Sequence, residues 1–287
     1  MEIERYSFFV GNKAQVVVAT RLKERNDRLL DRFSPTYFRN IGRTLLTEMK
    51  ASDDKSIGHH LAAAVRLTYG HAVETLFSML FAALQAPSYP IAWLQKYNPR
   101  DIKELMGRLE ANDDRFFKVG VRGKGWNGIV RTLIDVEDSD ELPRARIVDS
   151  FEQFWRTLAN DYRDDRTNDE YNSIKHGFRI EAGGFFASIG TSLDDMYTLG
   201  GSEYGATIQR RVALSNSPPS NKTSVFGLRE TRFNWDPARL CGRLDLINDS
   251  LHNIVAFLKA VRKRSMRSAE FLVETDSSVF QDASIAI

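Results

Sequence analysis

The sequence predicts a mainly α-helical protein, a helical bundle with a β-rich segment inserted before the last long helix. Three patterns support this fold class. Apolar residues recur every three or four positions from Ser56 to Ala86, and the same spacing returns from Leu240 to Val261. From Phe178 onward, apolar and polar residues alternate instead. A spacing of three or four places side chains on one helix face, whereas a period of two is typical of a strand.

The length and composition are those of an ordinary globular protein. The chain has 287 residues, enough for one large domain or two small ones, with 42% hydrophobic and 27% charged residues. The formal net charge is +2 and the pI is about 8.6. This balance is too even to predict nucleic-acid binding from charge alone, although it is compatible with a local basic patch.

The compartment is predicted from one cysteine and from the distribution of apolar residues. Cys241 is the single cysteine, which excludes an internal disulfide and a cysteine-based metal cluster within one chain. The charged start, Met1–Arg5, does not resemble a secretory signal. The most apolar stretch, Val73–Leu84, is expected to be too short and too polar to span a bilayer. We therefore expect a reducing, cytoplasmic location without membrane contact.

The domain organisation is predicted as five consecutive segments. These are an N-terminal extension (1–52), a helical core (53–177), a β-rich insertion (178–235), a closing core helix (236–268) and a tail (269–287). In the extension, Gln15–Ala19 is β-branched and predicts a short strand. Ser34 and Pro35 predict the start of a helix that runs to about Met49.

The remaining elements are predicted from their start and stop signals. Proline ends the first long helix at Pro87, and proline follows a capping asparagine at Asn98. Further helices are expected over 126–133, from Pro143 to Tyr162, and from Glu170 to a stop at Gly177. Two strands are expected over 204–214 and 223–235, and the residues between them, 215–221, are expected to form a loop. Asp236 and Pro237 predict the start of the last long helix. Its apolar seam is expected to pack along that of residues 61–84.

The sharpest candidate site is the polar stretch that ends at Gly177. Asn172 and His176 are one helical turn apart and share a face, Lys175 lies beside them, and Arg166 flanks the group. Histidine can transfer a proton near neutral pH, and a cation can stabilise phosphate charge. We expect the imidazole and the ammonium to face the protein rather than solvent. The alternative is an ordinary helix terminus, because Lys and His favour that position.

Glu74 is a supporting candidate because its sequence neighbours are apolar. A buried carboxylate is costly unless it is paired. We expect Glu74 to meet Lys175, His176 or an arginine of residues 163–179, with His71 one turn away on the same face. The alternative is a buried ion pair that fixes helix register.

Metal and cofactor sites are not predicted. His59 and His60 are adjacent, so they point apart on a helix, and they lack a second pair of ligands at metal-binding spacing. The stretch Gly120–Gly125 lacks the residue order of a phosphate-binding loop and is interpreted as a basic turn.

The helix containing Tyr69–Phe77, followed much later by Tyr171–Gly177, resembles the HEPN superfamily of helical-bundle proteins. The active motif of that family is an arginine and a polar residue, with a histidine four to six positions beyond the arginine. His176 matches the histidine, and no arginine stands at that spacing before it. The resemblance covers residues 56–177 and the helix from 236.

The resemblance implies a metal-independent ribonuclease, or an RNA-interacting component of a bacterial defence or toxin–antitoxin system. His176 would transfer a proton while the RNA 2′-hydroxyl attacks, and Arg166 or Lys175 would stabilise the phosphorane. Family members pair two motifs across a dimer, which implies a homodimer. Two alternatives stay open. One is a non-catalytic module that binds a cognate protein, and the other is a small-molecule sensor with its pocket beside Glu74.

Overall fold

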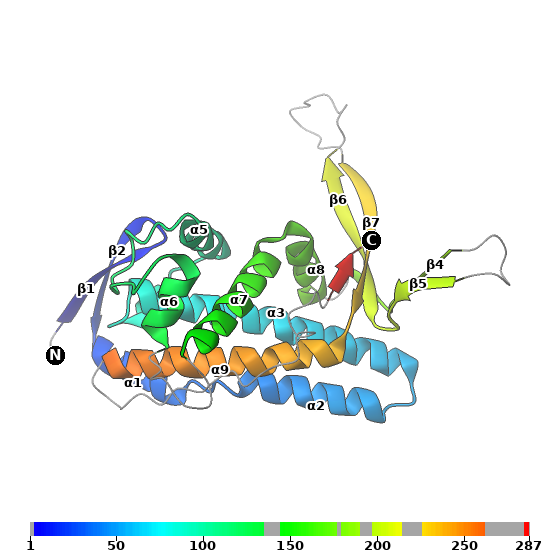
Figure 1. Cartoon of the computed structure of the whole chain (residues 1–287), viewed down its shortest axis with the longest axis horizontal. Helices are drawn as coiled ribbons and strands as arrows, with labels where there is room; N and C mark the ends of the chain where they lie inside the picture. Colours follow the sequence, from blue (N-terminus) through cyan, green and yellow to red (C-terminus); the bar gives the residue numbers. More distant parts are fainter. Residues whose placement is uncertain are drawn as a thin grey trace. The chain divides into compact units, whose positions relative to one another are not determined.

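The structure is mainly α-helical, and a segment of strands precedes the last long helix, which confirms the predicted fold class (Figure 1). It is a computed structural model that describes residues 3–134, 144–176, 179–189, 197–213, 226–261 and 284–286. The helices are α1 (Leu22–Arg32), α2 (Tyr37–Ala51), α3 (Lys55–Gln85), α4 (Pro90–Leu94), α5 (Pro99–Glu110), α6 (Gly125–Leu133), α7 (Arg144–Arg163), α8 (Asp165–Lys175) and α9 (Pro237–Val261). The strands are β1 (Ile3–Val10), β2 (Lys13–Thr20), β3 (Ile180–Ala182), β4 (Phe186–Ile189), β5 (Tyr197–Gly201), β6 (Gly205–Ala213), β7 (Phe226–Trp235) and β8 (Ser284–Ala286).

The described residues form two compact units. Unit 1 comprises the described residues of 1–39, 71–163 and 244–261. Unit 2 comprises those of 40–70, 164–243 and 284–286. Both α3 and α9 contribute to both units, so this division differs from the five consecutive segments that the sequence suggests.

Unit 1 begins with a β-hairpin. β1 and β2 pair antiparallel from Ile3↔Thr20 to Val10↔Lys13, and the two-residue turn starts at Gly11, whose φ is 60°. Glycine adopts this angle without the strain that a side chain would cause. The predicted strand Gln15–Ala19 is therefore confirmed within β2, whereas its partner β1 and the following helix α1 were not predicted.

The core of unit 1 contains a buried glutamine among aromatic rings. Gln85 Oε1 accepts hydrogen bonds from the Gly11 backbone N–H, 3.1 Å away, and from Trp93 Nε1, 2.9 Å away. Gln85 Nε2 donates to the carbonyl oxygens of Gly11 and Phe116. The amide thereby ties the hairpin turn to the end of α3. The large side chains packed in this unit are Phe77, Phe81, Trp93, Trp126, Phe151 and Trp155.

Unit 2 contains an antiparallel sheet with the strand order β3-β6-β7-β8. β6 pairs with β7 from Gly205↔Asn234 to Ala213↔Phe226, which confirms the two strands predicted around a loop. The predicted loop at 215–221 lies outside the described residues. So does the predicted tail, apart from β8, which pairs with the end of β7.

Helix starts follow the capping chemistry of the sequence. The capping box of Asn98 and Asp101 at α5 is present, and Asp236 accepts a hydrogen bond from the Arg239 N–H at the start of α9. α8 begins at Asp165, five residues before the predicted start at Glu170. The side chain of Asp164 accepts a hydrogen bond from the Thr167 N–H, 2.8 Å away, so it caps the helix before the predicted start.

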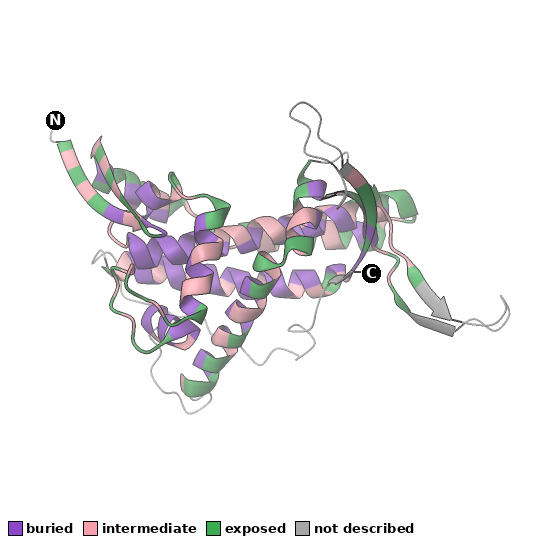
Figure 2. Cartoon of the chain, turned by 90° about the horizontal axis from the view of Figure 1, so that it is seen from above, coloured by how far each residue is buried: buried purple, intermediate pink, exposed green. Residues whose placement is uncertain are grey.

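The two long helices are largely buried (Figure 2). In unit 2 they meet where Arg243 Nη1 of α9 donates to the Tyr69 hydroxyl of α3, 3.0 Å away. By length and composition alone, α3, which contains Val73–Leu84, would qualify as a membrane span. However, 67% of its most apolar window is buried inside the protein, as in the core helix of a soluble protein.

Candidate functional site

The candidate residues of α8 divide between a buried face and an exposed face. Glu170, Ser173 and Ile174 are buried, whereas Arg166, Asn172, Lys175 and His176 are all exposed. The expectation that the imidazole and the ammonium face the protein is therefore wrong. Helical geometry explains the result, because the positions at 170, 173 and 174 take the single stripe that contacts the core.

Glu170 is the residue that holds α8 in place. Its carboxylate is fully buried and forms two hydrogen bonds with Arg66 of α3, Nε to Oε1 at 3.0 Å and Nη2 to Oε2 at 2.6 Å. The indole Nε1 of Trp235 also donates to Oε1. A bidentate guanidinium–carboxylate pair fixes distance and orientation together. A buried ion pair of the kind considered for Glu74 is therefore present at Glu170.

Aromatic contacts extend this buried cluster along α3. The Arg66 guanidinium lies 5.3 Å from the centroid of the Tyr69 ring, and that of Arg243 lies 5.9 Å from it. Next to Tyr69, Gly70 allows close packing of α8. A Cβ atom at position 70 would lie 2.4 Å from Cδ2 of Tyr171. The helices can approach this closely only because glycine has no side chain.

The exposed face ends in a hydrogen-bonded turn. The backbone N–H of His176 donates to the carbonyl of Asn172, 3.2 Å away, which confirms that these residues are one turn apart. Lys175 Nζ lies 5.7 Å from the centroid of the Tyr171 ring. Arg166 is ten positions before His176, which corresponds to roughly 15 Å along a helix. The structure thus groups Asn172, Lys175 and His176, and leaves Arg166 at the other end of α8.

Glu74 and His71 belong to unit 1, whereas Lys175 and His176 belong to unit 2. Their pairing stays a prediction. Within unit 1, Glu74 interacts with the hydroxyl of Tyr97. Burial raises the pKa of Tyr97, the nearby Glu74 carboxylate raises it further, and a hydrogen bond with Ser78 opposes the shift.

The other motifs have structural explanations. Among the described residues, no group of three or more His, Cys, Asp and Glu side chains could hold a metal ion. The His59 ring lies edge-on to Tyr204, and His60 is exposed. In the glycine-rich turn, the Arg122 N–H donates to the Thr132 hydroxyl.

Sequence reasoning missed most of the buried cluster. Arg66 lies on the same long helix as Glu74, and its neighbours in the sequence are equally apolar. That pattern could have identified Arg66 as a buried charge in need of a partner. Its partner is 104 positions away on α8, and no local pattern specifies that pairing.

Comparison with known proteins adds no relative. No protein-family model, curated protein or solved structure matches the chain.

Proposed function

We propose that this chain is a HEPN-like, RNA-interacting protein of a bacterial defence or toxin system, acting in the cytoplasm as a homodimer. The proposed contact surface is the exposed terminal turn of α8. One observation carries the proposal: Asn172, Lys175 and His176 are exposed on a helix whose opposite face is anchored by Glu170. A rigid helix that presents an amide, an ammonium and an imidazole suits contact with phosphate and ribose groups.

The stronger form of the proposal is metal-independent RNA cleavage. The RNA 2′-hydroxyl would lose its proton to a base and attack the adjacent phosphorus atom. A cyclic phosphate would form, and the 5′-oxygen would leave with a proton. His176 is the candidate for proton transfer and Lys175 for stabilising the charge on the phosphorane. Given its separation from His176, Arg166 suits contact with a phosphate farther along the strand.

A cleavage assay tests the stronger form. Purified protein is incubated with total RNA in excess chelator, and the products are resolved by size. Wild type should cleave, His176→Ala should not, and His60→Ala, which removes another exposed histidine of unit 2, should cleave like wild type. Equal cleavage by His176→Ala and wild type would refute the catalytic role.

The exposure of the terminal turn favours a second candidate, RNA binding without cleavage. Catalytic histidines are usually oriented by a second group, and within the described part of the chain no side-chain hydrogen bond to the His176 imidazole is found. Binding alone should show a steep salt dependence. Lys175→Ala should reduce the salt slope by about one unit, while Lys50→Ala, also an exposed lysine, should leave it unchanged.

A further inference from the structure

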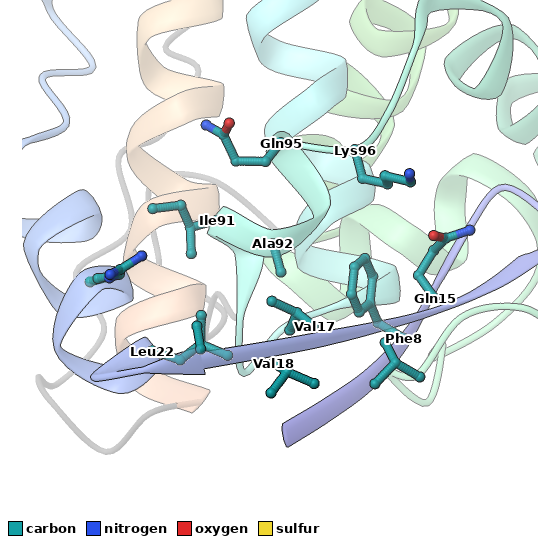
Figure 3. Close-up of a pocket in the computed structure, with 12 residues that line it drawn as sticks. Phe8, Gln15, Val17, Val18, Leu22, Ile91, Ala92, Gln95 and Lys96 are labelled. Carbon is teal, nitrogen blue, oxygen red and sulfur yellow. The ribbon is translucent and has the colours of Figure 1, made fainter. Parts of the chain in front are cut away.

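The β-hairpin of unit 1 borders a groove that is separate from α8. A cavity of about 380 Å³ lies between β2, the start of α1 and α4. Its apolar lining includes Phe8, Val17, Leu22, Ile91 and Ala92 (Figure 3). In Figure 3, Val17 and Ala92 point toward each other across this space. Glu74 does not line this cavity, so it is not the sensor pocket that the sequence suggested.

The groove runs along an unpaired strand edge. Five consecutive residues of β2, from Gln15 to Ala19, line it. Side chains alternate between the two faces of a strand, so a continuous run means that the backbone edge itself borders the cavity. β1 covers the other edge of β2, and within the described ranges no further strand pairs with β2.

The register identifies which backbone groups face the groove. Val10 and Lys13 flank a two-residue turn, so they form a hydrogen-bonded pair. Hydrogen-bonded pairs alternate along antiparallel strands, so the N–H and C=O groups of Val16 and Val18 point away from β1. Among the described residues, none bonds to these groups. The two residues are also 50% and 59% exposed, so this edge is apolar and open, the kind of edge that proteins usually protect.

The two charged residues that line the groove are both basic. Arg25 of α1 and Lys96, just after α4, line it, and no lining residue is acidic. Both side chains are exposed, and in the described structure neither forms an ion pair. A ligand with carboxylate groups would therefore meet complementary charge.

We propose that this groove binds an extended acidic peptide segment of another protein, which adds to β2 as a third strand. Its backbone would bond to Val16 and Val18, and the residue opposite Val17 would place an apolar side chain in the cavity beside Val17 and Ile91. Its carboxylates would reach Arg25 and Lys96. Strand addition of this kind gives affinity through the backbone and selectivity through the side-chain positions.

The same surface is poorly suited to a second copy of this chain. In such a pairing the incoming strand would be another β2, Lys13–Thr20, which carries no acidic side chain to meet Arg25 and Lys96. The charge pattern therefore favours an acidic partner over self-association.

The test uses the full chain and a fluorescent, acetylated peptide of sequence Asp-Thr-Val-Thr-Asp, in which the valine lies opposite Val17 and both threonine amides face β2. Fluorescence anisotropy should show saturable binding. A peptide with Lys at both Asp positions should bind at least about tenfold more weakly, because two attractive contacts become repulsive. A peptide N-methylated at both threonine amides should lose binding, because it cannot donate to the strand edge.

Variants of the protein locate the site. Val18→Pro should abolish binding, since proline removes an edge donor but is tolerated on an edge strand. Val18→Thr keeps the backbone groups and should bind like wild type. Arg25→Glu and Lys96→Glu should each weaken binding by at least about twofold to fivefold. The control is Arg100→Glu, which changes an exposed arginine outside the groove and should bind like wild type. If Val18→Pro does not fold, the charge variants and the N-methylated peptide still decide the outcome.

Three results would overturn the proposal. The first is no binding of the acidic peptide at about 1 mM, the weak end of specific affinity. The second is equal binding of the N-methylated peptide, which would mean that the strand edge is not used. The third is a concentration-dependent dimer that Val18→Pro converts to a monomer, which would identify the surface as an interface between copies of this chain.

Discussion

Each unit of this protein contains a buried polar anchor that includes a tryptophan indole, but one anchor is neutral and the other is charged. In unit 1, Gln85 binds the backbone of Gly11, 74 positions away, and the indole of Trp93. In unit 2, Glu170 binds Arg66, 104 positions away, and the indole of Trp235. Both anchors join distant segments of the chain through geometry that apolar contacts alone would not specify.

The difference between the anchors lies in what happens when one partner is lost. Removing the amide of Gln85 leaves neutral groups buried without partners, and the free energy of unfolding falls by the desolvation penalty of those groups. Removing the Glu170 carboxylate leaves a guanidinium buried without its counter-charge, and this lowers the free energy of unfolding more than the loss of the neutral amide does. The charged anchor should therefore dominate the stability of unit 2, and the neutral anchor should act more weakly in unit 1.

The largest effect is expected for Glu170→Ala. Arg66 would stay buried without its partner, and the free energy of unfolding should fall by about 3–5 kcal/mol. Urea denaturation followed by circular dichroism measures this change, with Glu48→Ala, an exposed glutamate of unit 2, as the control. The double variant Arg66→Met with Glu170→Leu should be more stable than Glu170→Ala, because no unpaired charge remains. A loss below about 0.5 kcal/mol for Glu170→Ala, the range of ordinary surface changes, would refute the anchor.

A smaller effect is expected for Gln85→Ala. The Gly11 N–H and the Trp93 indole would lose their acceptor, and unfolding should become easier by about 1–3 kcal/mol. The same denaturation assay applies. A loss larger than that of Glu170→Ala would reverse the proposed ranking of the two anchors.

The next effect concerns the cap of α8. Burial of the Asp164 carboxyl opposes the shift, but hydrogen bonds from Thr167 and the nearby Arg166 lower the pKa of this group overall. Its contribution to stability is therefore present above the unfolded value of about 3.9 and is lost as the pH falls through the lower folded value. Asp164→Ala should cost about 1 kcal/mol at pH 7 and much less near pH 2. Chemical denaturation at both pH values checks this, and a cost independent of pH would contradict the cap.

The smallest effect on stability is expected for His176→Ala. Because the side chain is exposed at the end of α8, the free energy of unfolding should change by less than about 0.5 kcal/mol. A differential scanning measurement beside wild type is sufficient. A change of about 2 kcal/mol or more would mean that His176 supports the fold, and that the cleavage assay cannot isolate its chemistry.

The sequence predicted the helices and strands that have strong local signals. The long helix α3, the capping box at Asn98 and the β6–β7 pair are examples. It missed β1, which pairs with β2 along its whole length, and it missed the cap of α8 at Asp164.

The candidate site was predicted less well than the fold. The grouping of Asn172, Lys175 and His176 follows from helical periodicity and is present. Their exposure depends on which face of α8 meets α3, and that is decided by Glu170 pairing with Arg66. A contact between residues so far apart in sequence has no local signature. The relation of Glu74 to this site stays a prediction.

The central claim is that the anchored helix α8 presents its terminal turn to RNA. Hydrogen–deuterium exchange of the wild-type protein, with and without a single-stranded RNA, tests it directly. Peptides covering Tyr171–His176 should gain protection when RNA is added, and the gain should disappear in the Lys175→Ala, His176→Ala double variant. Protection confined to other elements, or none at saturating RNA, would contradict the account.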